Sequence, residues 1–179
     1  MNDNRQWILF GVLGAASVGL SYVFTCAIPF AALATVAALN MNRRDALLLV
    51  GAAWGVNQAV GFGLLGYPLA TSTLLWGAAI GAAALLATLT VFQARSVISR
   101  FGGLGSAALG LIAAFLAYEA VLYMMALAMQ SGFGAFTSEI MREMFAVNVL
   151  ALAGLVALQK IAAYAGIQGS GRGTPHAAG

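Results

Sequence analysis

Apolar residues occur along this chain in long runs that are separated by short polar or glycine-containing segments. Runs of about 18 or more mostly apolar residues are typical of helices that cross a membrane. The sequence therefore predicts an all-α, polytopic membrane protein. Five apolar runs cover residues 7–41, 46–65, 69–93, 104–130 and 138–164.

The first run is too long for one membrane helix and needs a turn. As a single helix it would be about 52 Å long, against a hydrocarbon core of about 30 Å. Pro29 has no backbone N–H, and the residue before a proline, here Ile28, is biased away from helix. We therefore expect the segment "TCAIPF" to be the outer turn of a tight hairpin. The two helices that it joins are expected at about 7–24 and 29–41.

The basic residues favour six crossings over five, because positive charges concentrate in cytoplasmic segments. With six crossings and a cytoplasmic N-terminus, Arg142 alone among the eight basic residues falls outside. With five crossings, everything after the first run would flip, and Arg43, Arg44, Lys160 and Arg172 would lie outside. The basic residues that six crossings place inside are Arg5, Arg43, Arg44, Arg95, Arg100, Lys160 and Arg172.

The predicted architecture is thus a compact bundle of six transmembrane helices. We expect residues 1–166 to form a single domain and the Gly-rich segment 167–179 to be a flexible tail. The chain is expected in the cell (inner) membrane, with the N- and C-termini in the cytoplasm.

Composition agrees with a membrane protein and excludes several other classes. Hydrophobic residues make up 62% of the chain and charged residues 7%, against about 25% charged in a typical soluble domain. The basic residues are thinly spread, which argues against nucleic-acid binding. A single cysteine excludes an internal disulfide, and a single histidine, His176 in the tail, leaves no Cys/His metal cluster. No nucleophile–base pair is visible, so we expect neither an enzyme nor a bound cofactor.

Four polar residues are expected at a similar depth inside the bilayer. Glu119 lies near the middle of the fifth predicted helix, where a carboxylate costs roughly 2.5 to 3.5 kcal/mol on insertion scales. Asn57 and Gln58 on the third helix and Asn148 on the sixth fall at matching distances from the outer side. Two interpretations are open: the amides hydrogen-bond between helices, or all four groups converge on a ligand. We favour a ligand-binding cavity.

Aromatic residues would complete this cavity. Trp54 shares a helix face with Asn57 and Gln58, because these positions follow the spacing i, i+3, i+4. Tyr123, one turn beyond Glu119, and Trp76 are expected to form its walls. Cys26 lies at the predicted outer turn, either as an ordinary small residue or in contact with the ligand.

Small residues recur every four positions on three predicted helices and allow close helix packing. Gly51 and Gly55 do so on the third helix, and Gly77 and Gly81 on the fourth. On the first helix the repeat either packs within the bundle or docks a partner subunit. That repeat consists of Gly11, Ala15 and Gly19.

Six short helices, a polar cavity that leans outward and a first helix of small residues resemble the substrate-binding S component of energy-coupling-factor vitamin transporters. The resemblance implies uptake of a vitamin or cofactor precursor. It also implies a transmembrane coupling subunit docked on "GVLGAASVG", with separate ATPases. This chain has no Walker motif of its own. The competing function is a non-transporting membrane subunit for assembly or scaffolding.

Overall fold

The computed structural model describes residues 29–164 of the 179-residue chain. The described residues contain helices and turns but no strand, so the predicted all-α class is confirmed for this part. The predicted helix at 7–24, with its small-residue repeat, lies outside the described residues, as do Cys26 and the tail. The helices are α2 (Phe30–Asn40), α3 (Arg43–Gly63), α4 (Thr71–Ile98), α5 (Gly102–Met129) and α6 (Ser138–Tyr164), with short 3-10 helices η1 (Ser99–Phe101) and η2 (Phe133–Phe136).

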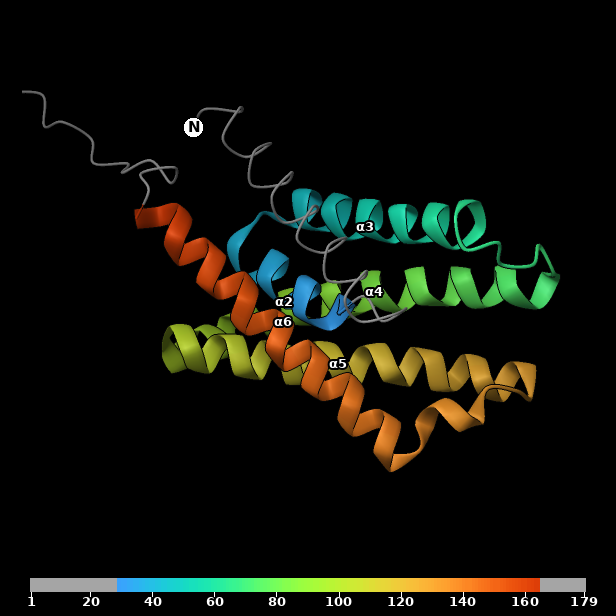
Figure 1. Ribbon diagram of the computed structural model, residues 1–179. Helices are drawn as coiled ribbons and strands as arrows, with labels where there is room; N and C mark the ends of the chain where they lie inside the picture. The colour runs from blue at the N-terminus through green and yellow to red at the C-terminus, as the bar shows by residue number, and fades with distance from the viewer. Residues whose placement is uncertain (1–28, 165–179) are drawn as a thin grey trace, which may run out of the picture.

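Three helical stretches are long and apolar enough to cross a membrane: Arg43–Gly63, Thr71–Met129 and Ser138–Ile161. The second comprises α4 and α5, which lie side by side because the chain reverses between them (Figure 1). Gly102 makes this reversal possible, since its φ of 72° is a conformation that side chains with a Cβ rarely adopt.

The helix expected at 29–41 is confirmed in position but not as a crossing. α2 has 11 residues, which at about 1.5 Å per residue is about 16 Å, roughly half of a hydrocarbon core. The described residues therefore do not show the predicted bundle of six membrane-spanning helices. They show four long helices that surround one short helix (Figure 1).

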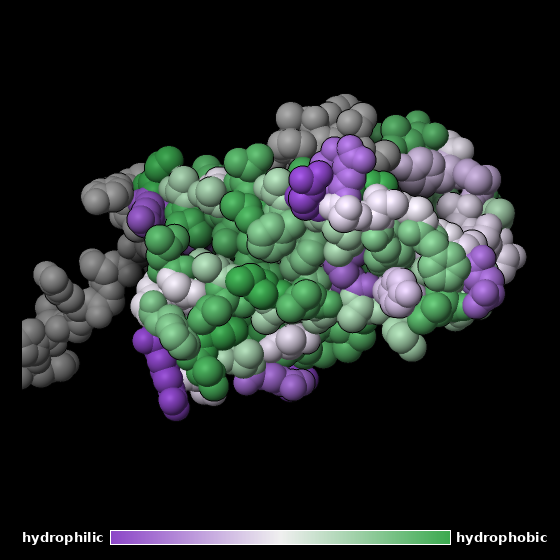
Figure 2. All heavy atoms as spheres, turned by 90° about the horizontal axis from the view of Figure 1, so that it is seen from below, coloured by the Kyte–Doolittle hydropathy of each residue, from purple (hydrophilic) through white to green (hydrophobic). Residues whose placement is uncertain are grey.

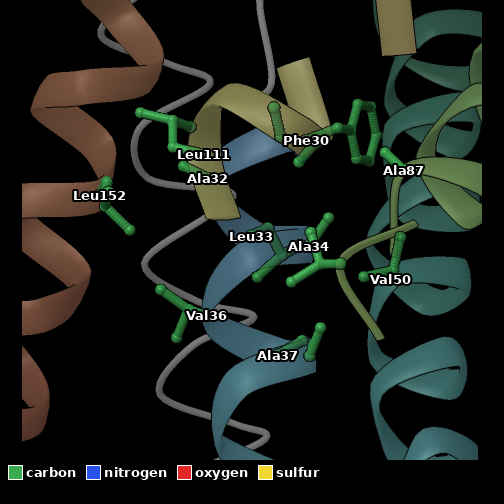
Figure 3. Packing of buried hydrophobic residues seen from close by; sticks show 14 of the residues in the cluster. Phe30, Ala32, Leu33, Ala34, Val36, Ala37, Val50, Ala87, Leu111 and Leu152 are labelled. Carbon is green, nitrogen blue, oxygen red and sulfur yellow. The ribbon is translucent and has the colours of Figure 1, made fainter. Parts of the chain in front are cut away.

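α2 is buried on all sides because its sequence offers no polar face. Its residues from Phe30 to Ala38 are all buried, and most of them are alanine. Its one buried hydroxyl, on Thr35, donates to the carbonyl of Ala31 one turn earlier at 2.7 Å, so this hydroxyl is paired within the helix. Figure 3 shows α2 between Leu152 of α6 on one side and Val50 of α3 and Ala87 of α4 on the other.

Both ends of α2 are capped by side chains from other helices. At its start, the Oδ1 atom of Asn148 on α6 accepts a hydrogen bond of 3.0 Å from the amide of Ala32. At its end, the guanidinium of Arg95 on α4 donates to the carbonyls of Leu39 at 2.9 Å and Met41 at 3.4 Å. These contacts satisfy backbone groups that a helix cannot satisfy by itself.

The contact with Asn148 shows that Pro29 is not at the outer surface, where the hairpin turn was predicted; the other residues of that turn lie outside the described residues. Asn148 lies ten residues into α6, about 15 Å from the start of that helix. The start of α2 therefore lies at mid-depth of the bundle, and Pro29 is buried instead of forming part of an outer surface turn.

α3 and α4 approach closely, as the small residues on α4 predicted. A Cβ on Gly77 would lie 2.5 Å from Oε1 of Gln58, and a Cβ on Gly81 would lie 2.7 Å from the Trp54 ring. The repeat on α3 does not serve this contact, because a Cβ at Gly51 or at Gly55 would meet no atom within 4 Å. The glycines on α4 thus receive large side chains from α3.

The outside of the bundle is largely apolar. Figure 2 shows hydrophobic side chains over most of one face, with hydrophilic residues as isolated groups. Leu69 and Leu104 are 77% and 84% exposed. Soluble proteins rarely expose such continuous apolar surface, and lipid is the solvent that suits it.

Candidate functional site

A cavity of about 200 Å³ lies beside the buried start of α2, and we name it the Glu119 cavity. Side chains from all five described helices and from the segment around η2 surround it. Its lining residues are Phe30, Ala31, Asn57, Trp76, Ile80, Tyr118, Glu119, Leu122, Ala135, Phe136, Ile140, Met144 and Asn148.

Four of the seven predicted ligand-binding residues line this cavity: Glu119, Asn57, Asn148 and Trp76. They come from four different helices, α5, α3, α6 and α4. Of the four polar residues expected at one depth, Glu119, Asn57 and Asn148 thus line one cavity, and Gln58 does not. Whether they bind a ligand stays a prediction.

The polar groups of Glu119 and Asn57 have no partner among the described residues. Both side chains are partly buried, yet neither has a hydrogen bond or ion pair within the described part of the chain. Buried polar groups in native proteins usually have partners, and an exception calls for an explanation such as a water or a ligand. A cavity that holds two such groups is suited to bind a polar molecule.

The side-chain amide of Asn148 takes part in two hydrogen bonds. Its Oδ1 atom caps α2, as described above, and its Nδ2 atom donates to the carbonyl of Met144 at 2.9 Å. An amide nitrogen carries two hydrogens, so one remains for a molecule in the cavity. The Oδ1 bond of Asn148 joins two helices, as the interhelical interpretation of a single Asn expects, whereas its Nδ2 bond stays within α6.

Aromatic rings form much of the cavity wall. The rings of Phe30 and Tyr118 stack with centroids 6.1 Å apart and an interplanar angle of 27°. The Trp76 ring packs directly on the backbone of Gly132, where an added Cβ would lie 2.6 Å from it. Gly132 has φ of 81°, so both its conformation and the space require glycine.

Three predicted site residues do not line the cavity, because the fold uses them in other contacts. The Nε1–H of Trp54 donates to the carbonyl of Gly77 at 2.8 Å, and Gln58 lies against the same glycine. Tyr123 is 45% exposed, and its ring packs edge-on against the ring of Phe136, with the ring centroids 5.2 Å apart. Trp54 and Gln58 therefore hold α3 to α4, and Tyr123 supports a residue of the cavity wall.

Sequence reasoning missed several lining residues, although part of the signal was present. Ile140, Met144 and Asn148 repeat every four residues and so form one stripe of α6. Tyr118 is the neighbour of Glu119 in sequence. Phe30 had no such signal, since its place in the wall depends on the buried position of α2.

A second cavity, of about 550 Å³, lies beside the other end of α2, and we name it the Arg95 cavity. Arg95 and Lys160 both line it, so the charged side chains among its described lining residues are basic. Its remaining lining residues are Thr35, Val36, Leu39, Asn40, Ser99, Gly103, Leu104, Ser106, Ala107, Leu152, Val156 and Gln159.

The described residues offer no metal centre, because no group of three or more His, Cys, Asp or Glu side chains comes together among them. Among the described residues that line the Glu119 cavity, Glu119 is the sole acidic one, and none is Lys or Arg. No family model, curated protein or solved structure matches this chain. The site is therefore interpreted from its own geometry.

Proposed function

We propose that this chain is a membrane transport protein that binds a small polar molecule in the Glu119 cavity for uptake. The observation that carries the proposal is the pair of partly buried polar side chains, Glu119 and Asn57, that face a cavity and have no partner in the described part of the chain. Pockets for small molecules are mostly apolar, with a few polar groups placed to fix the ligand.

The proposed orientation places the N- and C-termini in the cytoplasm of the cell (inner) membrane. It is supported by basic residues that gather at one end of the bundle: Arg95 reaches the carbonyl of Met41, two residues before Arg43, and shares a cavity with Lys160. In this orientation the Glu119 cavity leans toward the outside.

The six predicted membrane helices are kept in the proposal with one change. Four of them are the long helices α3 to α6, and α2 reaches about half of the way across. The sixth is the segment 7–24, which lies outside the described residues.

The partners belong to the proposal as well. By resemblance to S components of energy-coupling-factor transporters, the ligand is a vitamin or cofactor precursor. In that scheme the segment with Gly11, Ala15 and Gly19 docks a transmembrane coupling subunit that works with separate ATPases.

Orientation is tested with cysteines in a Cys26→Ala background. A cysteine at Ser72 or Gly134 should react with an impermeant thiol reagent on intact cells, and one at Ser99 should not. All three positions are exposed, so access from one side is the difference that the reagent reports. Labelling at Ser99 with silence at Ser72 would reverse the orientation.

Ligand binding is tested by mass spectrometry of small molecules that copurify with the protein from native membranes. Glu119→Gln and Asn57→Ala should retain about ten- to one-hundredfold less ligand per folded molecule than the wild type. Glu139→Gln is the matched control, because Glu139 is exposed at the start of α6 and does not line the cavity.

A second candidate function is a non-transporting subunit for assembly or scaffolding. Trp54 and Gln58 favour it, since these predicted ligand-binding residues hold helices together instead. If the scaffold function is correct, Glu119→Gln and Asn57→Ala will lower thermal stability in detergent. Each folded variant molecule will then retain as much ligand as the wild type, or neither the variants nor the wild type will retain any. That outcome would remove the transport proposal.

A further inference from the structure

Among its described lining residues, the Glu119 cavity has an acidic side chain and no basic one. Glu119 supplies a carboxylate, and the described residues of the lining include no Lys or Arg to balance it. An unpaired carboxylate in a low-dielectric site is costly, and an opposite charge within a few ångströms offsets that cost. A positively charged ligand would supply this charge, whereas an anion would be repelled.

The walls of the cavity suit an organic cation. Four aromatic residues line it: Phe30, Trp76, Tyr118 and Phe136. Aromatic faces attract ammonium groups, most strongly where water is excluded. The stacked pair of Phe30 and Tyr118 gives two of these rings a fixed place beside Glu119, which follows Tyr118 in the chain.

A metal ion fits the same charge poorly. Mg²⁺ and Ca²⁺ take six or more oxygen ligands, and carboxylates supply much of the negative charge. The cavity has one carboxylate, and no group of three or more acidic, Cys or His side chains forms in the part that the structure describes. Its volume of about 200 Å³ leaves room for a molecule of several heavy atoms.

We propose that the Glu119 cavity selects a small organic cation, an alkylamine or a quaternary ammonium compound, with Glu119 as its counter-ion and the surrounding aromatic rings as its cage. The Asn57 amide lines the same cavity and would hydrogen-bond a polar substituent of the cation. This inference rests on the proposed function, because it names the class of ligand for the same site.

The test compares pairs of probes that differ in charge and hardly in shape. Choline is paired with 3,3-dimethyl-1-butanol, in which carbon replaces the charged nitrogen, and benzylamine is paired with benzyl alcohol. Purified full-length protein in lipid nanodiscs is titrated with each probe, and binding is measured by calorimetry and by the shift in thermal unfolding. At least one cation should bind about tenfold more tightly than its neutral partner.

Glu119→Gln should remove this preference, because it keeps the size of the side chain and deletes its charge. Glu139→Gln should keep the preference, since Glu139 is exposed and outside the cavity. If Glu119→Gln does not fold, Glu119→Asp serves instead and should weaken cation binding while keeping its preference over the neutral probe. Thermal unfolding without ligand reports folding of each variant.

Three results would overturn the inference: equal binding of cation and neutral partner, a preference that Glu119→Gln leaves intact, or no binding of either cation. The copurification experiment separates this from failure of the proposed function. A neutral or anionic copurified ligand that depends on Glu119 would overturn cation selection alone. If no copurified molecule depends on Glu119 or Asn57, the proposed function fails as well.

Discussion

The two ends of α2 are built alike but are surrounded differently. Each end is capped by one side chain from a long helix, Asn148 at the start and Arg95 at the end. At the start, the neighbouring polar groups of Glu119 and Asn57 have no partners in the described part of the chain. At the end, the charged group nearest the helix is itself the cap.

This difference distinguishes residues that stabilise the fold from residues whose polar groups could still bind a ligand. Arg95 lines a cavity of about 550 Å³, more than the Glu119 cavity, yet its guanidinium already donates to two carbonyls. Cavity size alone would therefore favour the Arg95 end of α2. The availability of polar groups points to the Glu119 cavity, and the following variants test the contrast in order of expected effect on stability.

The largest loss is expected where α2 meets α5, between the two ends. A Cβ at Gly110 would lie 2.8 Å from Cγ2 of the buried residue Thr35, which cannot move aside freely. Gly110→Ala should lower the free energy of unfolding by about 1–3 kcal/mol, because overpacking of a core displaces its neighbours. Gly103→Ala on the same helix is the control, since an added Cβ there meets no atom within 4 Å. Equal effects on thermal unfolding in detergent would contradict the packing around α2.

Loss of the cap at the start of α2 should come next. Asn148→Ala removes the acceptor of the Ala32 amide and should cost about 1–2 kcal/mol, in the range of helix N-caps. Because Asn148 also lines the Glu119 cavity, ligand retention should fall together with stability. A variant with wild-type stability and normal retention would show that neither contact matters.

The cap at the end of α2 should contribute less. Arg95→Gln removes two hydrogen bonds from an exposed guanidinium and should cost about 1 kcal/mol. Ligand retention per folded molecule should not change, since Arg95 is outside the Glu119 cavity. Arg100→Gln controls for the lost charge, because the Arg100 side chain has no hydrogen bond or ion pair among the described residues. A loss of ligand retention in Arg95→Gln would contradict this separation and indicate that both cavities contribute to ligand binding.

The smallest effect on stability is expected at Asn57. Its side chain has no partner in the described part of the chain, so Asn57→Ala should change the free energy of unfolding by no more than about 0.5 kcal/mol. Thermal unfolding without ligand measures this change. A loss of 2 kcal/mol or more would show that Asn57 holds the bundle together and would weaken the contrast with Asn148.

Half of the candidate site could be predicted because depth in a membrane helix can be read from the sequence. Counting residues from the outer ends placed Glu119, Asn57 and Asn148 at one level, and the structure brings these three to one cavity. Rotation around each helix axis was harder to predict. Asn57 faces the cavity while its neighbour Gln58 packs on Gly77, and the sequence has amides at both positions.

The sequence by itself determined the all-α class, the approximate bounds of the five described helices and the apolar surface. Each of these depends on local composition and length, which act along the chain. The tertiary structure decided that α2 is a half-length helix buried among four others, because its burial depends on Gly110, Asn148 and Arg95, which lie far away in sequence. It also decided which polar groups are paired and which face a cavity, since a hydrogen bond requires two groups to meet in space and neither group alone reveals its partner.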